Sequence, residues 1–387
     1  MNKKLKNIFA FLHLWLGLAS GLVIMVICLT AAVWSFSPEI ESLQSFRHVA
    51  PQHIPHLPIT QLQAIANQQL PTKKLQRLTF NGKADAAVAE FYDEDYYYAA
   101  YINPYNGQVL KVRDEDHTFF RQVLLGHYSL WLGDTGREIV RWATLIFLLM
   151  LISGIVLWWP KNKAARKQRF KIKLGTSPKR LNYDLHNVLG FYASWVILFA
   201  ALTGVVWTFE WVANAEYWVA SGGKKNVPYS EPLSVKQASP APAARIDSLY
   251  IAVRKQYGER IEMAAVQFPT TDSAAIGISM YPRSNTYYNG DNLYFDRYTL
   301  RPLMPASYGR YTAANGGEKL SRMNYDIHIG NILGLPGRVA MFLGVLICAS
   351  LPVTGFYIWW GRKKRNKKKS FPAAVKRVAV PRLKAQV

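Results

Sequence analysis

Two pairs of histidines stand at matching places in two similar parts of the chain. His13 and His186 each follow a leucine at the start of a long apolar run, and His127 and His328 each precede another such run. Histidines in or beside membrane spans are uncommon and usually functional, and neutral imidazole binds haem iron, carries protons and binds metal ions. These four side chains are therefore the strongest candidates for chemistry in the sequence.

An internal duplication relates the two members of each pair. Residues 12–36 (LHLWLGLASGLVIMVICLTAAVWSF) align with residues 185–209 (LHNVLGFYASWVILFAALTGVVWTF) without a gap, and HYSLWLGDTGR from His127 aligns with HIGNILGLPGR from His328. His13 thus corresponds to His186, and His127 to His328. The sequence predicts two parallel repeats, related by a pseudo-twofold axis along the membrane normal.

The two pairs are expected at two levels of the membrane, His13 and His186 near the cytoplasmic face and His127 and His328 near the other. Two axial imidazoles at one level suit a noncovalent b-type haem, because bis-His iron changes oxidation state with little rearrangement. The sequence therefore predicts two haem b groups, and it contains no CxxCH motif for covalent attachment. Small and aromatic residues would help accommodate the macrocycles: Gly17, Gly190, Trp15 and Trp195.

Two matched arginines are candidates for holding haem propionates. Arg137 and Arg338 follow the second histidine of each repeat, and a guanidinium can bind a carboxylate in a bidentate manner. Three other interpretations of the histidines stay open at this point. They are polar contacts between packed helices, a proton relay, and a path for metal transport.

Four apolar runs are long enough to cross about 30 Å of hydrocarbon. They cover roughly residues 8–34, 139–159, 188–209 and 338–360, and the first is too long for the apolar part of a signal peptide. Residues 1–6, 161–180 and 362–387 are rich in Lys and Arg and contain no Asp or Glu, and their charge equals the whole formal net charge of +23. Because basic segments stay in the cytoplasm, residues 35–138 and 210–337 are expected outside. The same rule explains the basic excess without nucleic-acid binding.

The external segments have the patterns of two small α+β domains. Helical patterns at residues 60–70 and 245–258 precede strand patterns, of which LQRLTF, AVAEFYD and YYYAAYI are the clearest. The glycines between His127 and the second span predict a short amphipathic helix, a turn and then the span, and the same holds after His328. The expected fold is an α-helical integral membrane protein with four transmembrane helices in two parallel repeats and two small external α+β domains.

The expected organisation has eight parts. Residues 1–36 form the first transmembrane helix, 37–116 the first external domain, 117–160 an amphipathic helix with the second span, 161–180 a basic cytoplasmic loop, 181–210 the third span, 211–320 the second external domain, 321–361 an amphipathic segment with the fourth span, and 362–387 a basic cytoplasmic tail.

The order of helix, small α+β domain and helix, repeated twice with LHLWLG, LHNVLG, GHYSLWLGDTGR and TGFYIWW, resembles the PepSY-associated transmembrane family. This family includes iron-regulated inner-membrane proteins and haem-containing ferric-siderophore reductases of Gram-negative bacteria. The resemblance implies periplasmic PepSY-like domains, a multi-pass inner-membrane location with both termini in the cytoplasm, and haem-dependent reduction of a ferric siderophore for iron uptake.

The electron donor is not indicated by the sequence. GxGxxG and GxxxxGK[ST] do not occur, so a soluble flavoprotein, a reduced carrier and membrane quinol are all open. Two functions of other classes also stay open. One is a proton or metal transporter that uses the histidines, and the other is a noncatalytic membrane anchor whose external domains bind a partner protein.

Three further sequence features allow predictions: a histidine-rich tract, two aspartates near paired histidines, and the two cysteines. The tract with His48, His53 and His56 could bind metal, but its prolines favour an extended linker. Asp184 and Asp326 each stand two residues before a histidine in the shared word Asn-Tyr-Asp, and we expect them to cap helix N-termini. The only cysteines, Cys28 and Cys348, lie in predicted spans, so no disulfide supports the external domains.

Overall fold

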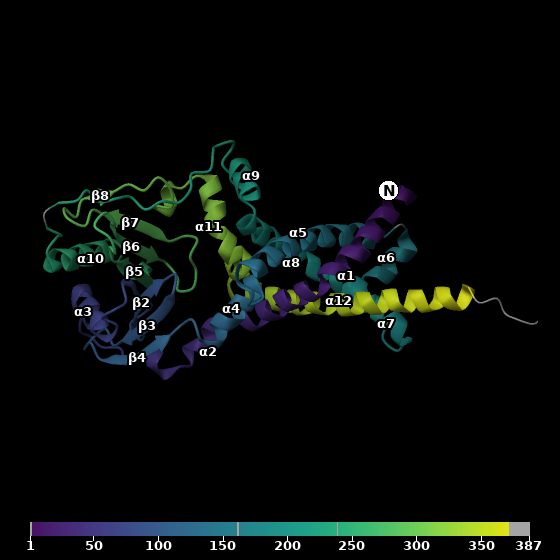
Figure 1. The fold of residues 1–387 in the computed structure, drawn as a ribbon, viewed down its shortest axis with the longest axis horizontal. Helices are drawn as coiled ribbons and strands as arrows, with labels where there is room; N and C mark the ends of the chain where they lie inside the picture. Colours follow the sequence, from purple (N-terminus) through teal and green to yellow (C-terminus); the bar gives the residue numbers. More distant parts are fainter. Residues whose placement is uncertain (1, 161, 238, 371–387) are drawn as a thin grey trace, which may run out of the picture.

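The computed structural model describes residues 2–160, 162–237 and 239–370. Long helices form a bundle, and a β-sheet with its own helices lies beyond one end of that bundle (Figure 1). Four helical stretches in the described ranges are long and apolar enough to cross a membrane: Lys3–Ser42, Gly133–Trp158, Pro178–Thr208 and Asn331–Lys363. They match the four apolar runs expected from the sequence to within one residue at the ends where the runs extend further. The prediction of four helices long and apolar enough to span a membrane is therefore confirmed.

The bundle consists of α1 (Lys3–Trp34), α5 (Gly133–Trp158), α8 (Gly190–Thr208) and α12 (Gly334–Ser370). α1 and α8 each pack against both α5 and α12, which gives a closed ring of four helices. Its core buries Ile24, Ile197 and Val345. Cys28 and Cys348 are buried there as free thiols. Both cysteines thus lie in the helical bundle and outside the sheet region, as the sequence predicted.

The two external segments, expected as two small α+β domains, join in one antiparallel sheet of eight strands. Its order is β4-β3-β2-β1-β5-β6-β7-β8, so each half of the chain contributes four strands and β1 joins β5 at the centre. The strands are β1 (Leu75–Phe80), β2 (Ala87–Asp93), β3 (Tyr96–Ile102), β4 (Val109–Asp114), β5 (Met263–Gln267), β6 (Ile276–Tyr281), β7 (Asp291–Phe295) and β8 (Pro302–Leu303).

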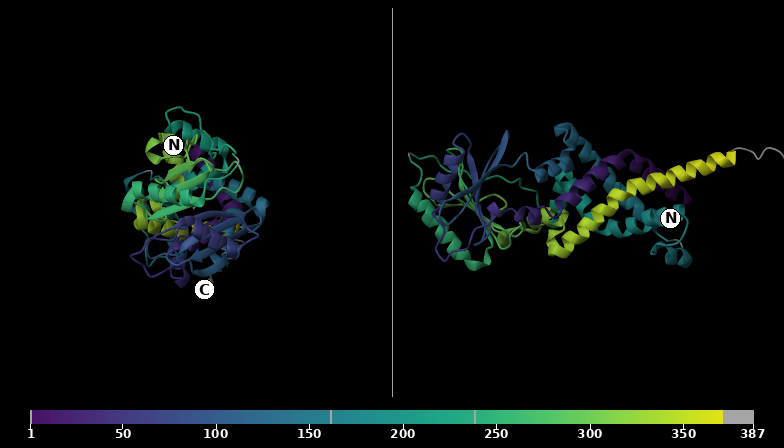
Figure 2. Two further views of the ribbon diagram at one scale, coloured as in Figure 1. Left: turned by 90° about the vertical axis from the view of Figure 1, so that its left-hand side faces the viewer. Right: turned by 90° about the horizontal axis from the view of Figure 1, so that it is seen from below.

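Two helices cover the face of the sheet that points away from the bundle, as the views in Figures 1 and 2 agree. They are α3 (Ile59–Gln69) and α10 (Ala243–Tyr257). A single core lies between these helices and the sheet and buries Leu62, Leu78 and Val266. Asp247 of α10 accepts hydrogen bonds from the backbone N–H of Thr60 (3.0 Å) and from its hydroxyl (2.6 Å), which ties the two halves together.

Two helices connect the sheet to the bundle. α4 (Phe119–Ser129) packs on α1 and α5, and α11 (Gly316–His328) packs on α8 and α9 (Glu210–Ala220). The shorter elements are α2 (Ser37–Ser42), η1 (Ser45–Arg47), α6 (Lys163–Arg169), α7 (Pro178–Asp184), η2 (Leu185–Leu189), η3 (Gly258–Arg260), η4 (Tyr311–Ala313) and η5 (Asn331–Leu333).

The two ends of the bundle differ in what they carry. The start of α1, the basic helix α6 and the far end of α12 all lie at the end away from the sheet (Figure 1). The sheet and the helices α4, α9 and α11 lie at the opposite end. The predicted basic tail falls mostly on residues 371–387, which are outside the described residues.

Candidate functional site

His127 and His328, the sheet-side pair, lie next to each other where α4 and α11 end. Their ring centroids are 6.1 Å apart, and the ring planes make an angle of 79°. Each histidine stands in the last turn of its helix, before a break in the chain. The predicted order of short helix, turn and span is therefore confirmed in both halves.

Glycines make these two breaks possible. After α4 the chain turns through Leu130 and Trp131, which have φ of 52° and 57°, and after α11 it turns through Gly330, with φ of 79°. A Cβ on Gly136 would lie 1.6 Å from the carbonyl oxygen of Ser129, and one on Gly337 would lie 2.1 Å from that of Gly330. The turns are so tight that only glycine fits at these two positions.

The other pair, His13 and His186, lies toward the opposite end of the bundle and is called the far pair. His13 projects from α1, and His186 lies in η2, a single π-turn that leads from α7 into α8. π-turns inside helices occur often at functional sites. Along α1, the two residues that contact His127, Ile27 and Thr30, are about 21 and about 26 Å from His13, at 1.5 Å per residue. The structure thus places the two pairs at two levels, as the sequence predicted.

Each histidine has a partner at Nδ1, and the partners correspond between the halves. The Nδ1 of His13 lies 3.0 Å from the Ser153 hydroxyl, and that of His186 lies 2.8 Å from the Thr354 hydroxyl. At the sheet-side pair, the Nδ1 of His328 lies 2.9 Å from the Thr203 hydroxyl. The Nδ1 of His127 lies 3.0 Å from the carbonyl oxygen of Ile27 and 3.4 Å from the hydroxyl of Thr30, the residue that aligns with Thr203.

The chemistry of these partners decides where each imidazole carries its proton. A hydroxyl has one hydrogen, and these hydroxyls already donate it to a carbonyl of their own helix. Ser153 donates to Met150 (3.0 Å), Thr354 to Leu351 (3.0 Å) and Thr203 to Phe199 (3.0 Å). While each hydroxyl donates to its own helix, it accepts from Nδ1, as the carbonyl of Ile27 does. In all four histidines Nδ1 donates, and Nε2 keeps the lone pair that binds a metal.

The sheet-side pair has the spacing of two imidazoles on one metal ion. A metal–imidazole bond of about 2 Å on each side, plus the distance from nitrogen to ring centre, gives a centroid separation of about 6 Å. The observed 6.1 Å is close to this value, and with ring planes at 79° it is also an ordinary distance for two rings packed edge to face. Among the described residues, no group of three or more His, Cys, Asp or Glu could hold a metal ion. A macrocycle that supplies the remaining four ligands, as haem does, fits this donor set.

The far pair lines a cavity of about 410 Å³ inside the bundle. This volume is typical of small-molecule sites. A Cβ on Gly154 would lie 3.3 Å from Cε1 of His13, and one on Gly355 would lie 3.3 Å from Cε1 of His186. The predicted Gly17 and Gly190 also line the cavity. Gly154 and Gly355 thus leave room for the two imidazole rings against the neighbouring helices, and Gly17 and Gly190 leave parts of the cavity wall without a side chain.

Three basic side chains from three helices also line this cavity: Lys6, Arg169 and Arg362. They have the charge needed for haem propionates, because a guanidinium or ammonium group pairs with a carboxylate. In the sequence these three residues belong to the basic segments. The tendency of basic segments to stay in the cytoplasm already explained their charge, so nothing marked them as binding residues. They were therefore missed as site residues.

The two predicted propionate-binding arginines pair with carboxylates of the protein. Arg137 is exposed and lies 2.8 Å from Asp134. Arg338 pairs with Glu39 and lies over the ring of Phe36. Neither arginine is among the residues that line the far cavity. Their assignment to the outer haem stays a prediction.

The prediction that Asp184 and Asp326 cap helix N-termini is wrong. Ser177 and Asn315 hold the N-cap positions, while both aspartates lie at the ends of α7 and α11. Asp184 accepts from the guanidinium of Arg180 at 3.0 Å. The prediction failed because both helices begin several residues before the Asn-Tyr-Asp sequence, and the sequence pattern did not show this.

Asp326 instead ties the sheet to the helix of His328. It is completely buried, and it accepts from the backbone N–H groups of Tyr287 (3.2 Å) and Tyr288 (3.1 Å). The amide of Asn331 donates to it as well (3.1 Å). These bonds fix the loop between β6 and β7 against the turn that positions His328.

The tract of three histidines packs on the sheet region without forming a joint ligand set. His48 Nδ1 lies 3.2 Å from Asp85, and His56 stacks on Phe80 with a centroid distance of 5.6 Å. Burial lowers the pKa of His56, which favours the neutral ring. His53 is exposed. The interpretation of this tract as an extended linker agrees with its irregular backbone.

The Asp326 contacts give a test of how His328 is positioned. Replacing Asp326 by Ala removes charge-assisted bonds worth about 3 kcal/mol together, so amides of residues 283–290 should exchange hydrogen about 100-fold faster. Hydrogen exchange followed by mass spectrometry measures this in the whole protein. Glu259→Ala, a change at an exposed carboxylate, is the control. Unchanged exchange in Asp326→Ala would show that the loop is held by other contacts.

Comparison with known proteins places the chain in a family. Residues 10–362 match the family model described as the PepSY-associated TM region. No curated protein matches the sequence. The matched range includes all four paired histidines and nearly all residues of the candidate spans, and it covers most of the chain. The protein therefore belongs to the PepSY-associated transmembrane family.

Proposed function

We propose that this protein carries electrons across a bacterial inner membrane and reduces a ferric siderophore in the periplasm from Fe(III) to Fe(II). The proposal rests on the four histidines, which form two pairs at two levels and all donate through Nδ1, leaving Nε2 for iron. Each pair would hold one b-type haem, which supplies one-electron Fe(III)/Fe(II) chemistry when bound. Reduction weakens the binding of iron by hard oxygen ligands and so releases it.

Other residues of the chain support the two proposed haems. At the far pair, Lys6, Arg169 and Arg362 would neutralise the propionates, and the glycines of the cavity leave room for the ring. Trp158 and Phe191, which both line this cavity, stack with their ring centroids 3.6 Å apart and give it a flat apolar surface. At the sheet-side pair, Arg137 and Arg338 are the proposed partners for propionates. The Nδ1 bonds hold each ring in one orientation.

The distribution of charge supports the proposed orientation in the membrane. Residues 162–180 and residues 2–6, which are rich in Lys and Arg, lie at the end of the bundle opposite the sheet (Figure 1). Basic segments remain in the cytoplasm, so both termini are proposed to be cytoplasmic and the sheet periplasmic. Electrons would then enter at the far pair from a donor on the cytoplasmic side and leave at the sheet-side pair.

Corresponding contacts in the two halves support the proposed duplication. The hydrogen-bond partners of His13 and His127 belong to the first half, and those of His186 and His328 belong to the second. Ser153 aligns with Thr354, and Thr30 with Thr203. Two parallel repeats that each hold one member of every pair would produce this arrangement.

The Nδ1 bonds predict a change of redox potential. In Thr203→Val, His328 loses the acceptor that makes its imidazole more electron-rich, so Fe(III) is less stabilised. The midpoint potential of the sheet-side haem should rise by about 40 mV, which corresponds to about 1 kcal/mol for one electron. Thr144→Val, a change at a hydroxyl bonded only to a backbone carbonyl of its own helix, is the control for redox titration. An unchanged potential in Thr203→Val would contradict the assigned role of this hydrogen bond.

Sealed vesicles test the transfer of electrons across the membrane. The lumen holds ferric tris(acetohydroxamate) and a membrane-impermeant indicator of Fe(II), and dithionite is added outside. Vesicles with the wild-type protein should develop the Fe(II) colour, because electrons cross in molecules whose sheet faces the lumen. His186→Ala and His328→Ala should reduce the rate to that of empty vesicles.

A control substitution distinguishes loss of the proposed electron path from a general effect of replacing a histidine. His53→Ala alters an exposed histidine outside both pairs, and it should leave the rate of Fe(II) formation unchanged. A wild-type rate in His186→Ala would contradict the proposed route. A noncatalytic anchor, or a transporter of protons or metal ions, predicts no Fe(II) in any of these vesicles.

A further inference from the structure

The helix α9 carries four apolar side chains on its exposed face, which we call the α9 stripe. Trp211, Trp218 and Val219 are 66%, 59% and 71% exposed, and Ala215 is exposed as well. Their spacing of four, three and one residues places them in one row along the helix. In the part of the chain that the structure describes, no other helix or strand covers this row. A contiguous apolar surface that includes two tryptophans indicates contact with an apolar partner.

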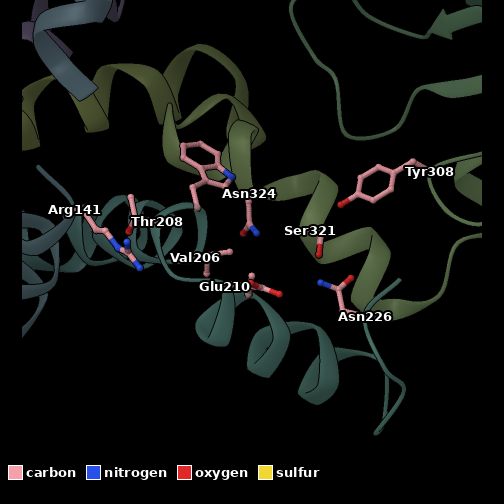
Figure 3. Close-up of a pocket in the computed structure, with 10 residues that line it drawn as sticks. Arg141, Val206, Thr208, Glu210, Asn226, Tyr308, Ser321 and Asn324 are labelled. Carbon is pink, nitrogen blue, oxygen red and sulfur yellow. The ribbon is translucent and has the colours of Figure 1, made fainter. Parts of the chain in front are cut away.

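The opposite face of α9 packs on α11 through polar contacts. Tyr217 is buried, and its hydroxyl accepts from the side-chain amide of Asn315 at 2.8 Å. The carboxylate of Glu216 accepts from the side-chain amide of Asn324, also at 2.8 Å. Figure 3 shows Asn324 on the side of α11 that faces the start of α9. The hydrogen-bonding groups of α9 are thus used on one face of the helix and the apolar groups on the other.

Two glycines of α11 let the two helices approach closely. A Cβ on Gly316 would lie 2.3 Å from the carbonyl oxygen of Ala220, and one on Gly317 would lie 2.8 Å from that of Tyr217. A larger side chain at either position would push the helices apart. This close packing fixes the orientation of α9, and with it the direction in which the α9 stripe points.

α9 begins directly after a candidate membrane span. Only Phe209 separates Thr208, the last residue of α8, from Glu210, the first residue of α9. Phe209 has extended backbone angles (φ −127°, ψ 108°), so the two helices do not continue in one line. Figure 1 shows α9 running across the long axis of the bundle. A helix in this position lies along the surface of the membrane that α8 crosses.

The direction of the α9 stripe and the residues in it suit a lipid surface. In Figure 1, α11 lies on the sheet side of α9, so the face opposite α11 points toward the level of the spans. Tryptophan is enriched at the membrane–water interface because its ring is apolar and its N–H is polar. α9 contains no Lys or Arg, so the contact does not depend on the charge of anionic headgroups.

We infer that α9 is a membrane-surface helix whose stripe lies at the boundary between the headgroups and the acyl chains of the sheet-side leaflet. The partner is phospholipid, bound through its acyl chains and without a charge requirement. Because α9 is fixed on α11, the lipid contact also supports the helix whose last turn contains His328. The inference depends on the membrane spans and is independent of electron transfer.

Spin labels on introduced cysteines test where the α9 stripe lies. The whole chain is placed in phosphatidylcholine nanodiscs with one label, at Ala215→Cys or Val219→Cys. Power-saturation electron paramagnetic resonance compares collisions with oxygen, which dissolves in the bilayer, and with a Ni(II) chelate, which stays in water. Both labels should collide more often with oxygen and lie about 5–10 Å inside the headgroup region.

Two controls accompany the labelled variants. Ser248→Cys, at an exposed position of α10, should show the reverse preference, because that helix lies on the face of the sheet that points away from the bundle. The wild type gives the background signal, because its only cysteines, Cys28 and Cys348, are buried.

A charge placed in the α9 stripe tests whether lipid contact holds the helix. Val219→Asp puts a carboxylate at the apolar boundary, so the amides of α9 should exchange hydrogen about tenfold faster in the same nanodiscs. Asn214→Asp adds the same charge to an exposed polar position of the same helix and should leave this exchange unchanged. Unchanged exchange in β2 shows that the rest of the fold is intact in both variants.

Three results would overturn the inference. Labels at residues 215 and 219 that collide mainly with the Ni(II) chelate would place the α9 stripe in water. Labels protected from both reagents would show that protein, such as a second copy of this chain, covers it. Equal exchange in Val219→Asp and Asn214→Asp would show that lipid does not hold α9. The vesicle experiment tests electron transfer separately from all of these results.

Discussion

The hydrogen bond that each paired imidazole donates through Nδ1 is the interaction on which the rest of the structure depends. It sets the tautomer, and it fixes the ring relative to a second helix, so both the chemistry and the position of Nε2 follow from it. The acceptors are hydroxyls whose own hydrogens are already committed to helix carbonyls, or a carbonyl itself.

These contacts also explain how the two halves of the chain are assembled. Within the first half, His13 bonds to α5 and His127 bonds to α1, and the second half repeats this with α12 and α8. Each half therefore orients its own histidines, and the packing of α1 and α8 against both α5 and α12 brings the halves together to form the pairs. The tight turns at Gly136 and Gly337 return the chain into the bundle directly after the sheet-side histidines.

Much of this arrangement follows from sequence pattern. The strands β1, β2 and β3 and the helix–turn–span order after His127 were predictable, because alternation and glycine position are local signals. The pairing of β1 with β5 was not, since it depends on contacts between distant segments. The role of Asp326 was missed for the same reason: its partners lie in a loop some forty residues away, as Tyr287 does. Arg169 and Arg362 were not predicted as binding residues, because membrane orientation already explained the basic segments that contain them.

The most direct test of the central claim is the haem content of the purified protein, measured with its reduced-minus-oxidised visible spectrum. The account predicts a low-spin b-type spectrum with two haems per chain. His186→Ala should lose one haem and His328→Ala the other, with the remaining haem unchanged in each case. A colourless, folded protein, or a single haem lost in both variants, would contradict the assignment of two separate histidine pairs.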